Sequence, residues 1–249
     1  MPSTRALRLH TGRVLWPEHK PEAEVLALQA ETPELTWETT YQGNMVNPSG
    51  AVFLREWWTG KNRWSDRSDP GPVWISFDTA ESEAMGSAYT AWCVGTLLPD
   101  YRLRLDEAGR RRVEFPQLVE LIKSVAQRYQ SDYLQAIIIE DKSSGKQAVQ
   151  TLRQQAERWL AKRIIAYNPR VDKPMRWNQS ASWCALGCVL LPHPGGSVPW
   201  LFEFEDELFG VPGSATLDFA DAFAQLIIFT ENLLSEGWRA RSKQHEAIR

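Results

Sequence analysis

Three short apolar runs follow one another closely after residue 71, with turn residues between them. VWISFD spans 73–78, a second run spans 88–98 and stops before Pro99, and the alternating segment 101–115 follows. Apolar or alternating runs of this length, bounded by turn residues, are typical of β-strands. Because the connections are short enough for hairpins, we predict an antiparallel meander over these three segments.

The next part of the chain alternates between the helical and the strand pattern. Apolar residues recur at helical spacing over 116–125, behind a proline at an early helical position. A buried strand over 135–140, a helix over 142–162 and another short strand over 163–169 follow. Strands and helices in this order predict a mixed α/β sheet covered by helices.

The last third is less regular. It holds a polar stretch over 170–183, a Pro/Gly-rich loop over 191–200 and an acidic helix over 200–210. A long amphipathic helix over 217–238 follows, and its apolar face is expected to pack on the sheet.

The first 70 residues differ from the rest. Only 21–32 shows a convincing helical pattern, and the run Asn-Pro-Ser-Gly at 47–50 is a turn signal. We therefore expect an irregular linker or entry arm over 1–70, a main domain over 71–237 and a charged tail over 238–249.

Composition narrows the class of protein. A formal charge of −3 argues against a protein that coats nucleic acid by bulk electrostatics, although it leaves room for local contacts to phosphates. The three cysteines, Cys93, Cys184 and Cys188, form neither an even disulfide set nor a zinc motif, so buried thiols in a reducing compartment are expected. The sequence shows no secretory signal or membrane span, which predicts a cytosolic protein without a membrane partner.

Acidic residues occur where this fold class places its ligands. Asp78 closes the first strand of the meander and Glu140 closes the strand 135–140. Asp218 and Asp221 lie three residues apart at the start of the last helix and share one face. Taken singly, each acid has a plain structural alternative as a turn former, a solvated loop residue or a helix cap.

The joint pattern points to metal chemistry. Three carboxylate sources that converge would repel one another unless a cation lay between them, and hard oxygen ligands suit Mg²⁺ or Mn²⁺. Two such ions about 4 Å apart can activate a water molecule and stabilise the leaving oxygen of a phosphodiester. The sequence therefore predicts a nuclease.

Four strings make this prediction specific. WISFDTAES, RRRVEFPQLVELI, AIIIEDKSSGKQAVQTL and LDFADAFAQLIIF, in this order and spacing, resemble the C-terminal nuclease domain of phage terminase large subunits, and TTYQGNMVNPSGAVFLREWW resembles the segment that precedes it. The resemblance implies a ribonuclease H-like fold. It also implies a two-metal endonuclease that cuts concatemeric double-stranded viral DNA during packaging, in the cytoplasm of a bacterial host.

The resemblance assigns the metal ligands residue by residue. The family's first acid corresponds to Asp78, the second to Glu140 with Asp141 beside it, and the third to Asp218 with Asp221. Relatives carry a further acid in the second strand, where this chain has Thr90, so Glu81 or Glu83 is a candidate accessory residue. Relatives also open the last motif with His-Asp-Asp, where this chain has Thr216-Leu217-Asp218; we favour Asp218 as the primary ligand there.

The same resemblance names partners. In the family an ATPase precedes the nuclease, and a small terminase subunit and a portal join the assembly. The run around Gly145-Lys146 lacks the glycine and the Ser or Thr of a phosphate-binding loop, so we do not expect this chain to hydrolyse ATP by itself.

Contacts to DNA phosphates are weaker predictions. Lys142 and Lys146 flank the second acid, and Lys173 and Arg176 lie in the polar stretch; a solvated surface is the alternative for all four. Two rivals to a packaging endonuclease stay open: a Holliday-junction resolvase or transposase-like nuclease with the same fold, and a non-catalytic module of the packaging assembly.

Overall fold

The computed structural model describes residues 14, 17, 20–31, 50–67, 69–79 and 89–247, with side chains up to residue 235. The chain divides into two compact units, residues 1–52 and residues 53–249. In the first unit the expected helix is present as α1 (Glu22–Glu31). The second unit holds the sheet and the acidic residues.

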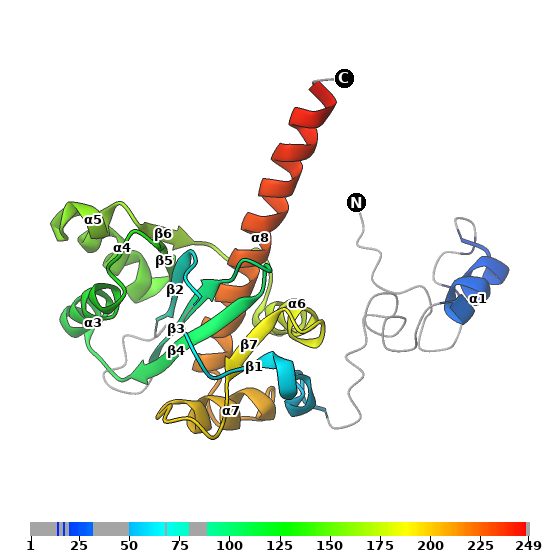
Figure 1. Cartoon of the computed structure of the whole chain (residues 1–249), viewed down its shortest axis with the longest axis horizontal. Coiled ribbons are helices and arrows are strands. Elements are labelled where there is room, and N and C mark those ends of the chain that lie inside the picture. Colours follow the sequence, from blue (N-terminus) through cyan, green and yellow to red (C-terminus); the bar gives the residue numbers. More distant parts are fainter. Residues whose placement is uncertain are drawn as a thin grey trace. The chain divides into compact units, whose positions relative to one another are not determined.

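A mixed sheet is the centre of the second unit, and it has seven strands in the described part of the chain. Their order across the sheet is β1-β7-β4-β3-β2-β5-β6 (Figure 1). The strands are β1 (Arg63–Trp64), β2 (Val73–Asp78), β3 (Thr90–Leu97), β4 (Leu103–Arg111), β5 (Leu134–Glu140), β6 (Ile164–Tyr167) and β7 (Val189–Pro192). Strands β2, β3 and β4 pair antiparallel, which confirms the predicted meander, whereas β5 runs parallel to β2 and β6 parallel to β5.

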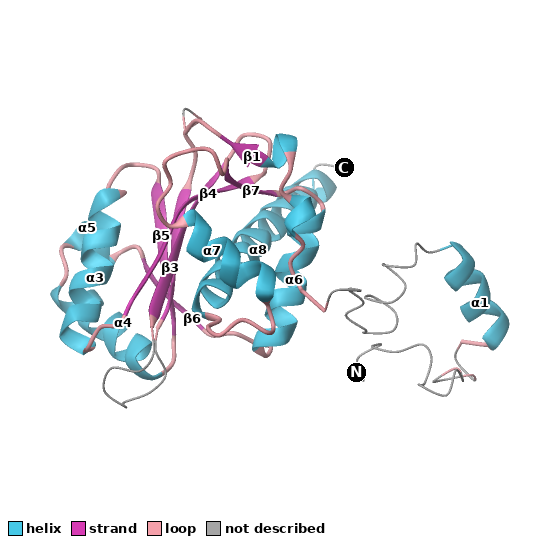
Figure 2. Cartoon of the chain, turned by 90° about the horizontal axis from the view of Figure 1, so that it is seen from below, coloured by secondary structure: helices cyan, strands magenta, loops and turns pink. Residues whose placement is uncertain are grey.

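Helices cover both faces of this sheet, as Figures 1 and 2 show. One face carries α3, α4 and α5, and the other carries α6, α7 and α8. The helices are α3 (Phe115–Arg128), α4 (Ser143–Gln155), α5 (Arg158–Ala161), α6 (Lys173–Ala185), α7 (Leu201–Gly210) and α8 (Asp218–Ala247), and two short 3-10 turns, η2 (Arg55–Trp57) and η3 (Gly60–Asn62), precede β1. The predicted α/β class with flanking helices is thus confirmed.

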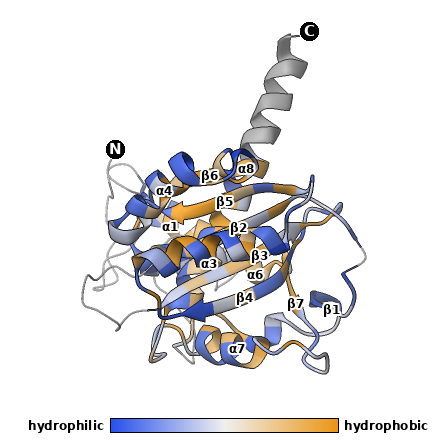
Figure 3. Ribbon diagram, turned by 90° about the vertical axis from the view of Figure 1, so that its left-hand side faces the viewer, coloured by the Kyte–Doolittle hydropathy of each residue, from blue (hydrophilic) through white to orange (hydrophobic). Residues whose placement is uncertain are grey.

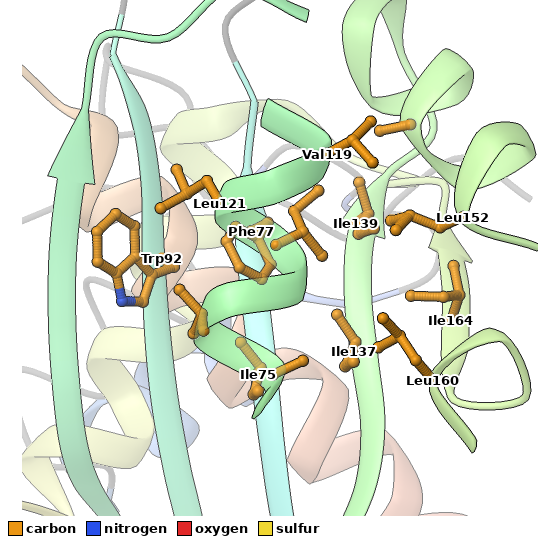
Figure 4. Packing of buried hydrophobic residues seen from close by; sticks show 14 of the residues in the cluster. Ile75, Phe77, Trp92, Val119, Leu121, Ile137, Ile139, Leu152, Leu160 and Ile164 are labelled. Carbon is orange, nitrogen blue, oxygen red and sulfur yellow. The ribbon is translucent and has the colours of Figure 1, made fainter. Parts of the chain in front are cut away.

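The alternation of side chains along β2 and β5 decides which residues reach which layer. Ile75 and Phe77 of β2 lie with Ile137 and Ile139 of β5 in the apolar core beneath α3 and α4 (Figure 4). The hydropathy colouring in Figure 3 shows β5 as one of the most apolar segments. Since neighbours in a strand point to opposite faces, Asp78 belongs to the face that α6 and α8 cover.

The polar stretch 170–183 contains most of helix α6. Asp172 caps α6 by accepting a hydrogen bond from the Met175 amide at 3.1 Å, and Pro174 lies in the first turn. Its buried apolar residues, Trp177, Ala181 and Cys184, are spaced four and three apart. These residues form a narrow apolar stripe, and the polar residues around it make the helical pattern hard to recognise in the sequence.

The compact unit begins earlier and its last helix ends later than the expected boundaries. Phe53 and the residues after it belong to the second unit, so the border lies near residue 53 and not near residue 71. Strand β1 pairs parallel to β7, and the indole of Trp58 donates to the Val189 carbonyl at 3.0 Å. Helix α8 continues to Ala247, through most of the stretch expected to be a separate tail. None of the helices in the described residues is both long and apolar enough to span a membrane.

Candidate metal centre

Asp78 and Glu140 meet because β2 and β5 are neighbouring parallel strands. Phe77 is in register with Ile139, so the next residue of each strand emerges at the same edge of the sheet. Both carboxylates are buried, with 7% and 3% of their surfaces exposed, and they share a hydrogen bond. The two strand ends thus bring the two acids together.

The pKa values of the two carboxyl groups shift in opposite directions. Burial, the Asp221 charge and the hydrogen bond with Glu140 together raise the pKa of Asp78 well above its ordinary value. Burial also raises the pKa of Glu140, but the hydrogen bond from Asp78 and the contact with Lys142 outweigh it and the net shift is downward. These opposite shifts favour the protonated form of Asp78 and the ionised form of Glu140.

Asp221, in the first turn of α8, supplies the third buried carboxylate. Only 2% of this residue is exposed. Its Oδ2 lies 2.6 Å from the Lys173 ammonium and its Oδ1 accepts a hydrogen bond from the Trp177 indole at 2.9 Å. Both donors belong to α6, so the packing of α6 on α8 binds this acid from the side.

Two further positively charged side chains, Arg176 and Lys142, lie within the acidic cluster. The Arg176 guanidinium is 2% exposed and lies between two carboxylates, 3.9 Å from Glu140 Oε1 and 4.0 Å from Asp221 Oδ1. Its Nε and Nη1 make no hydrogen bond with the described residues. Lys142 Nζ lies 3.0 Å from Glu140 Oε1. Three of the four side chains expected to contact DNA phosphates thus contact the acids.

The other expected site residues lie further out. Asp218 begins α8 and is half-buried; burial raises its pKa, and so does Asp221, while Arg110 and Lys173 lower it. Asp141 is half-buried and its amide donates to the Tyr167 carbonyl at 2.7 Å, while Lys146 is exposed on α4. Glu81 and Glu83 lie outside the described residues. Of the two α8 acids, Asp221 is the more buried, and its charge is the one that raises the pKa of Asp78.

The start of α8 is anchored by a buried network that sequence reasoning missed. Glu207 of α7 accepts hydrogen bonds from Arg110 at 2.7 Å, from Thr216 at 2.6 Å and from the Ala220 amide at 3.1 Å. The last bond satisfies one of the free N–H groups of the first helical turn. Glu207 thereby fixes the turn that carries Asp221.

A second anchor lies one turn further along α8. The Gln225 amide nitrogen donates to Ser76 Oγ at 2.9 Å and to the Phe77 carbonyl at 3.2 Å, directly before Asp78. It also lies 3.5 Å from the Ile138 carbonyl. Gln225 thus links α8 to two neighbouring strands, a contact that depends on the tertiary fold.

Helix α4 begins against the other side of the pair. A Cβ on Gly145 would lie 2.1 Å from the Glu140 carbonyl oxygen and 2.8 Å from Thr79 Oγ1. Only glycine permits this approach. The helix start is therefore held directly against the end of β5.

The donor set fits a divalent cation in part. Carboxylate oxygens suit Mg²⁺ or Mn²⁺, and a cation could replace the proton that Asp78 and Glu140 share. Within the described residues no three His, Cys, Asp or Glu side chains are arranged so as to hold a metal ion. The Asp78–Glu140 pair thus forms the core of the candidate centre, and Asp221 is linked to it through the α6 cations.

Comparison with known proteins gives a clear structural answer. No protein-family model matches this chain, and no curated protein matches its sequence. The large terminase of a thermophilic bacteriophage superposes with a TM-score of 0.53 at 11% identity, over 84% of this chain and 54% of that one. The complex of the same terminase with ADP gives 0.54 at 12% identity, over 83% and 51% of the two chains.

A shorter protein matches over nearly its whole length. The large terminase nuclease of thermophilic phage G20c, solved with bound cobalt, superposes with a TM-score of 0.50 at 14% identity, over 70% of this chain and 95% of that one. The present chain spans about half the length of the longer large terminase. Identities this low establish the fold alone. The chain therefore has the ribonuclease H-like α/β fold of large-terminase nuclease domains.

Proposed function

We propose that this protein is a divalent-metal-dependent endonuclease that cleaves double-stranded viral DNA during genome packaging. The observation that carries the proposal is the buried Asp78–Glu140 pair, with Asp221 close enough to raise the pKa of Asp78, at a strand edge of a terminase-nuclease fold. Buried carboxylates that must share a proton cost stability unless they serve a cation.

The residues divide the work between binding metal and holding DNA. Asp78 and Glu140 would hold one Mg²⁺ or Mn²⁺ ion, and Asp78 together with an acid of α8 would hold a second. When bound, such ions lower the pKa of a water molecule and stabilise the leaving oxygen of the phosphodiester. On burial and contacts we assign the α8 role to Asp221, with Asp218 as a weaker or outer ligand.

Positive side chains at the rim would position the DNA backbone. Lys146 is exposed near the start of α4, one helical turn from Lys142, and is free to meet phosphate while Lys142 stays beside Glu140. Asp141 and Glu81 are proposed as accessory acids. Contacts between lysine side chains and phosphates recognise the DNA backbone, so they imply little sequence preference.

The setting of the reaction is also a proposal. The longer of the two matched proteins is a large terminase, and this chain corresponds to about half of it. We propose that the protein works with a terminase ATPase domain, a small terminase subunit and a portal in the cytoplasm of a bacterial host. These partners would restrain a nuclease that otherwise endangers the genome being packaged.

Cleavage of plasmid DNA with Mg²⁺ or Mn²⁺ tests the activity. We expect Asp78→Ala and Glu140→Ala to lower the rate by more than about 100-fold, since loss of mere supporting partners of metal ligands already costs 10–100-fold. Asp100→Ala is the matched control, because Asp100 is an exposed acid paired with Arg102. Unchanged cutting by the Asp78 variant would exclude the mechanism, and preference for branched over linear duplex would favour a resolvase.

A non-catalytic packaging module is the second candidate. It is favoured by one observation: each acid of the cluster already has a cation or a proton as its partner. Calorimetric titration separates the two functions. Binding of Mn²⁺ by the wild type but not by Asp78→Ala supports the enzyme, whereas absence of binding in both supports the module.

A further inference from the structure

Lys173 lies directly beside Asp221, the α8 carboxylate assigned above to the second metal ion. Its ammonium lies 2.6 Å from Asp221 Oδ2, and the Trp177 indole takes the other oxygen at 2.9 Å. Both oxygens of Asp221 are therefore engaged by α6. Each carboxylate oxygen keeps a second lone pair, so the obstacle to a metal ion is the positive charge 2.6 Å from Oδ2 and not the hydrogen bond itself.

The charge balance points the same way. Asp78, Glu140 and Asp221 contribute at most three negative charges, and Lys142, Lys173 and Arg176 contribute three positive charges within 4.0 Å of the last two acids. One divalent ion between Asp78 and Glu140 would be balanced by the two carboxylates that hold it. A second divalent ion would add two further positive charges to a buried site in which no negative charge is left to balance them.

The two α6 cations differ in their freedom to leave. Arg176 is fixed, because its side chain is 2% exposed beneath the acids. Lys173 is the first residue of α6, and its side chain is 40% exposed, so rotation about its four side-chain bonds can take the ammonium away from Asp221. A DNA phosphate at the rim is a competing partner of the right charge.

We propose that Lys173 excludes the second metal ion from Asp221 in the DNA-free protein, and that substrate phosphate draws it away. The site then holds one ion at Asp78 and Glu140 until DNA arrives. This regulation rests on the proposed nuclease function. It would make the complete two-ion site depend on bound substrate.

Manganese titration of the full chain tests the exclusion, with Mn²⁺ as both probe and spectroscopic label. We expect about one Mn²⁺ per chain in the wild type and about two in Lys173→Met and in Lys173→Gln, which removes the charge but keeps a donor for Asp221. Two ions about 4 Å apart also give a spin-coupled electron paramagnetic resonance signal, which an isolated ion lacks. Lys162→Met, a change of the same charge at an exposed lysine after α5, should behave as the wild type.

The DNA arm uses a short phosphorothioate duplex, which slows hydrolysis. The wild type should show the spin-coupled signal only with duplex, and Lys173→Met should show it without. Two ions in the DNA-free wild type, or one ion in both Lys173 variants, would overturn the exclusion; no coupled signal in the wild type with duplex would overturn the displacement. Failure of the nuclease proposal itself gives a different result, namely no bound Mn²⁺ in the wild type or either variant.

Discussion

The proton shared by Asp78 and Glu140 ties the candidate site to the stability of the fold. Because the pKa of Asp78 is raised in the folded protein, the folded state binds this proton more tightly than the unfolded state. The contribution to stability is complete below the ordinary carboxyl pKa and is lost as pH rises through the raised value. The metal-free protein should therefore lose stability as pH rises through this window.

Asp78→Asn tests this sign. The amide cannot ionise, so without metal the variant should be more stable than the wild type above the raised pKa and should lack this part of the pH dependence. Urea unfolding in a chelator, repeated across the acid-to-neutral range, measures both effects.

Added Mg²⁺ should stabilise the wild type but not Asp78→Asn, because only the wild type keeps the ligand pair. Asp100→Asn controls for the loss of a carboxylate, since the Asp100–Arg102 pair is exposed and contributes little. Parallel pH curves for Asp78→Asn and the wild type would contradict the shared proton.

At the scale of single residues, the sequence predicts where the acids of the site lie better than it predicts which cations contact them. Asp78 and Glu140 could be recognised because each closes an apolar strand, and parallel strand ends meet at one edge. The contacts of Lys173 and Arg176 with acids could not be recognised, because they depend on how α6 packs against α8. Their spacing of three, in a helix start marked by the capping Asp172 and by Pro174, is the one local signal of a shared helix face.

Among the elements, α7 serves to hold the start of α8. Glu207→Ala would remove one of the two carboxylates that contact the half-buried Arg110 and would leave the Ala220 amide without an acceptor. A buried donor left without its acceptor typically costs about 1–3 kcal/mol. Chemical denaturation should show a destabilisation of this order.

Glu203→Ala is the matched control for this prediction. Glu203 contacts the same Arg110 from the same helix, but its side chain is 59% exposed, so the expected cost is about 0–1 kcal/mol. An equal loss of unfolding free energy in the two variants would show that only the charge of Arg110 matters. The hydrogen bond from the Ala220 amide to Glu207 would then contribute nothing measurable.

The junction between β5 and α4 gives a second prediction at this scale. Gly145→Ala would place a methyl group 2.1 Å from the Glu140 carbonyl, so the helix start must move away from the strand end. Overpacking of this kind typically costs about 1–3 kcal/mol, and the shift should also weaken Mn²⁺ binding at Glu140.

Gly213→Ala is the control, because its Cβ would lie 3.5 Å from its nearest neighbour, an ordinary contact distance. Thermal unfolding and Mn²⁺ titration of the two variants provide the comparison. Unchanged metal affinity in Gly145→Ala would show that the position of α4 does not control the pair.

Periodicity predicts those elements whose pattern is strong, and it fails for weak ones. The meander, β5, α3, α4 and α8 carry continuous apolar runs or a broad apolar stripe, and the structure contains each of them. Helix α6 buries only a narrow stripe, while β1 spans Arg63–Trp64 and β7 spans Val189–Pro192. These two short segments are strands because β1 pairs with β7 and β7 pairs with β4. No local sequence pattern encodes such pairings.

On the scale of the whole molecule, the border of the folded unit is a testable quantity. Residues 53–64 belong to the unit that holds the sheet, through the Phe53–Phe223 ring contact, the Trp58 hydrogen bond and the Arg63–Glu205 ion pair. Their composition resembles that of a linker, because turn residues and polar residues separate the aromatic anchors. Only the tertiary contacts reveal that they are part of the domain.

Two truncations distinguish the observed border from the one expected from composition. A chain lacking residues 1–52 should unfold at nearly the same urea concentration as the full chain and should bind Mn²⁺ equally well, because the sheet and the acids lie in the second unit. A chain lacking residues 1–70 also loses β1 and the buried Trp58 and Phe53 side chains. Since removal of one buried large aromatic side chain costs about 3–5 kcal/mol, this shorter chain should be strongly destabilised. If both truncations were equally stable, residues 53–70 would be a linker after all; if both were unstable, the first unit would be required for the fold of the second.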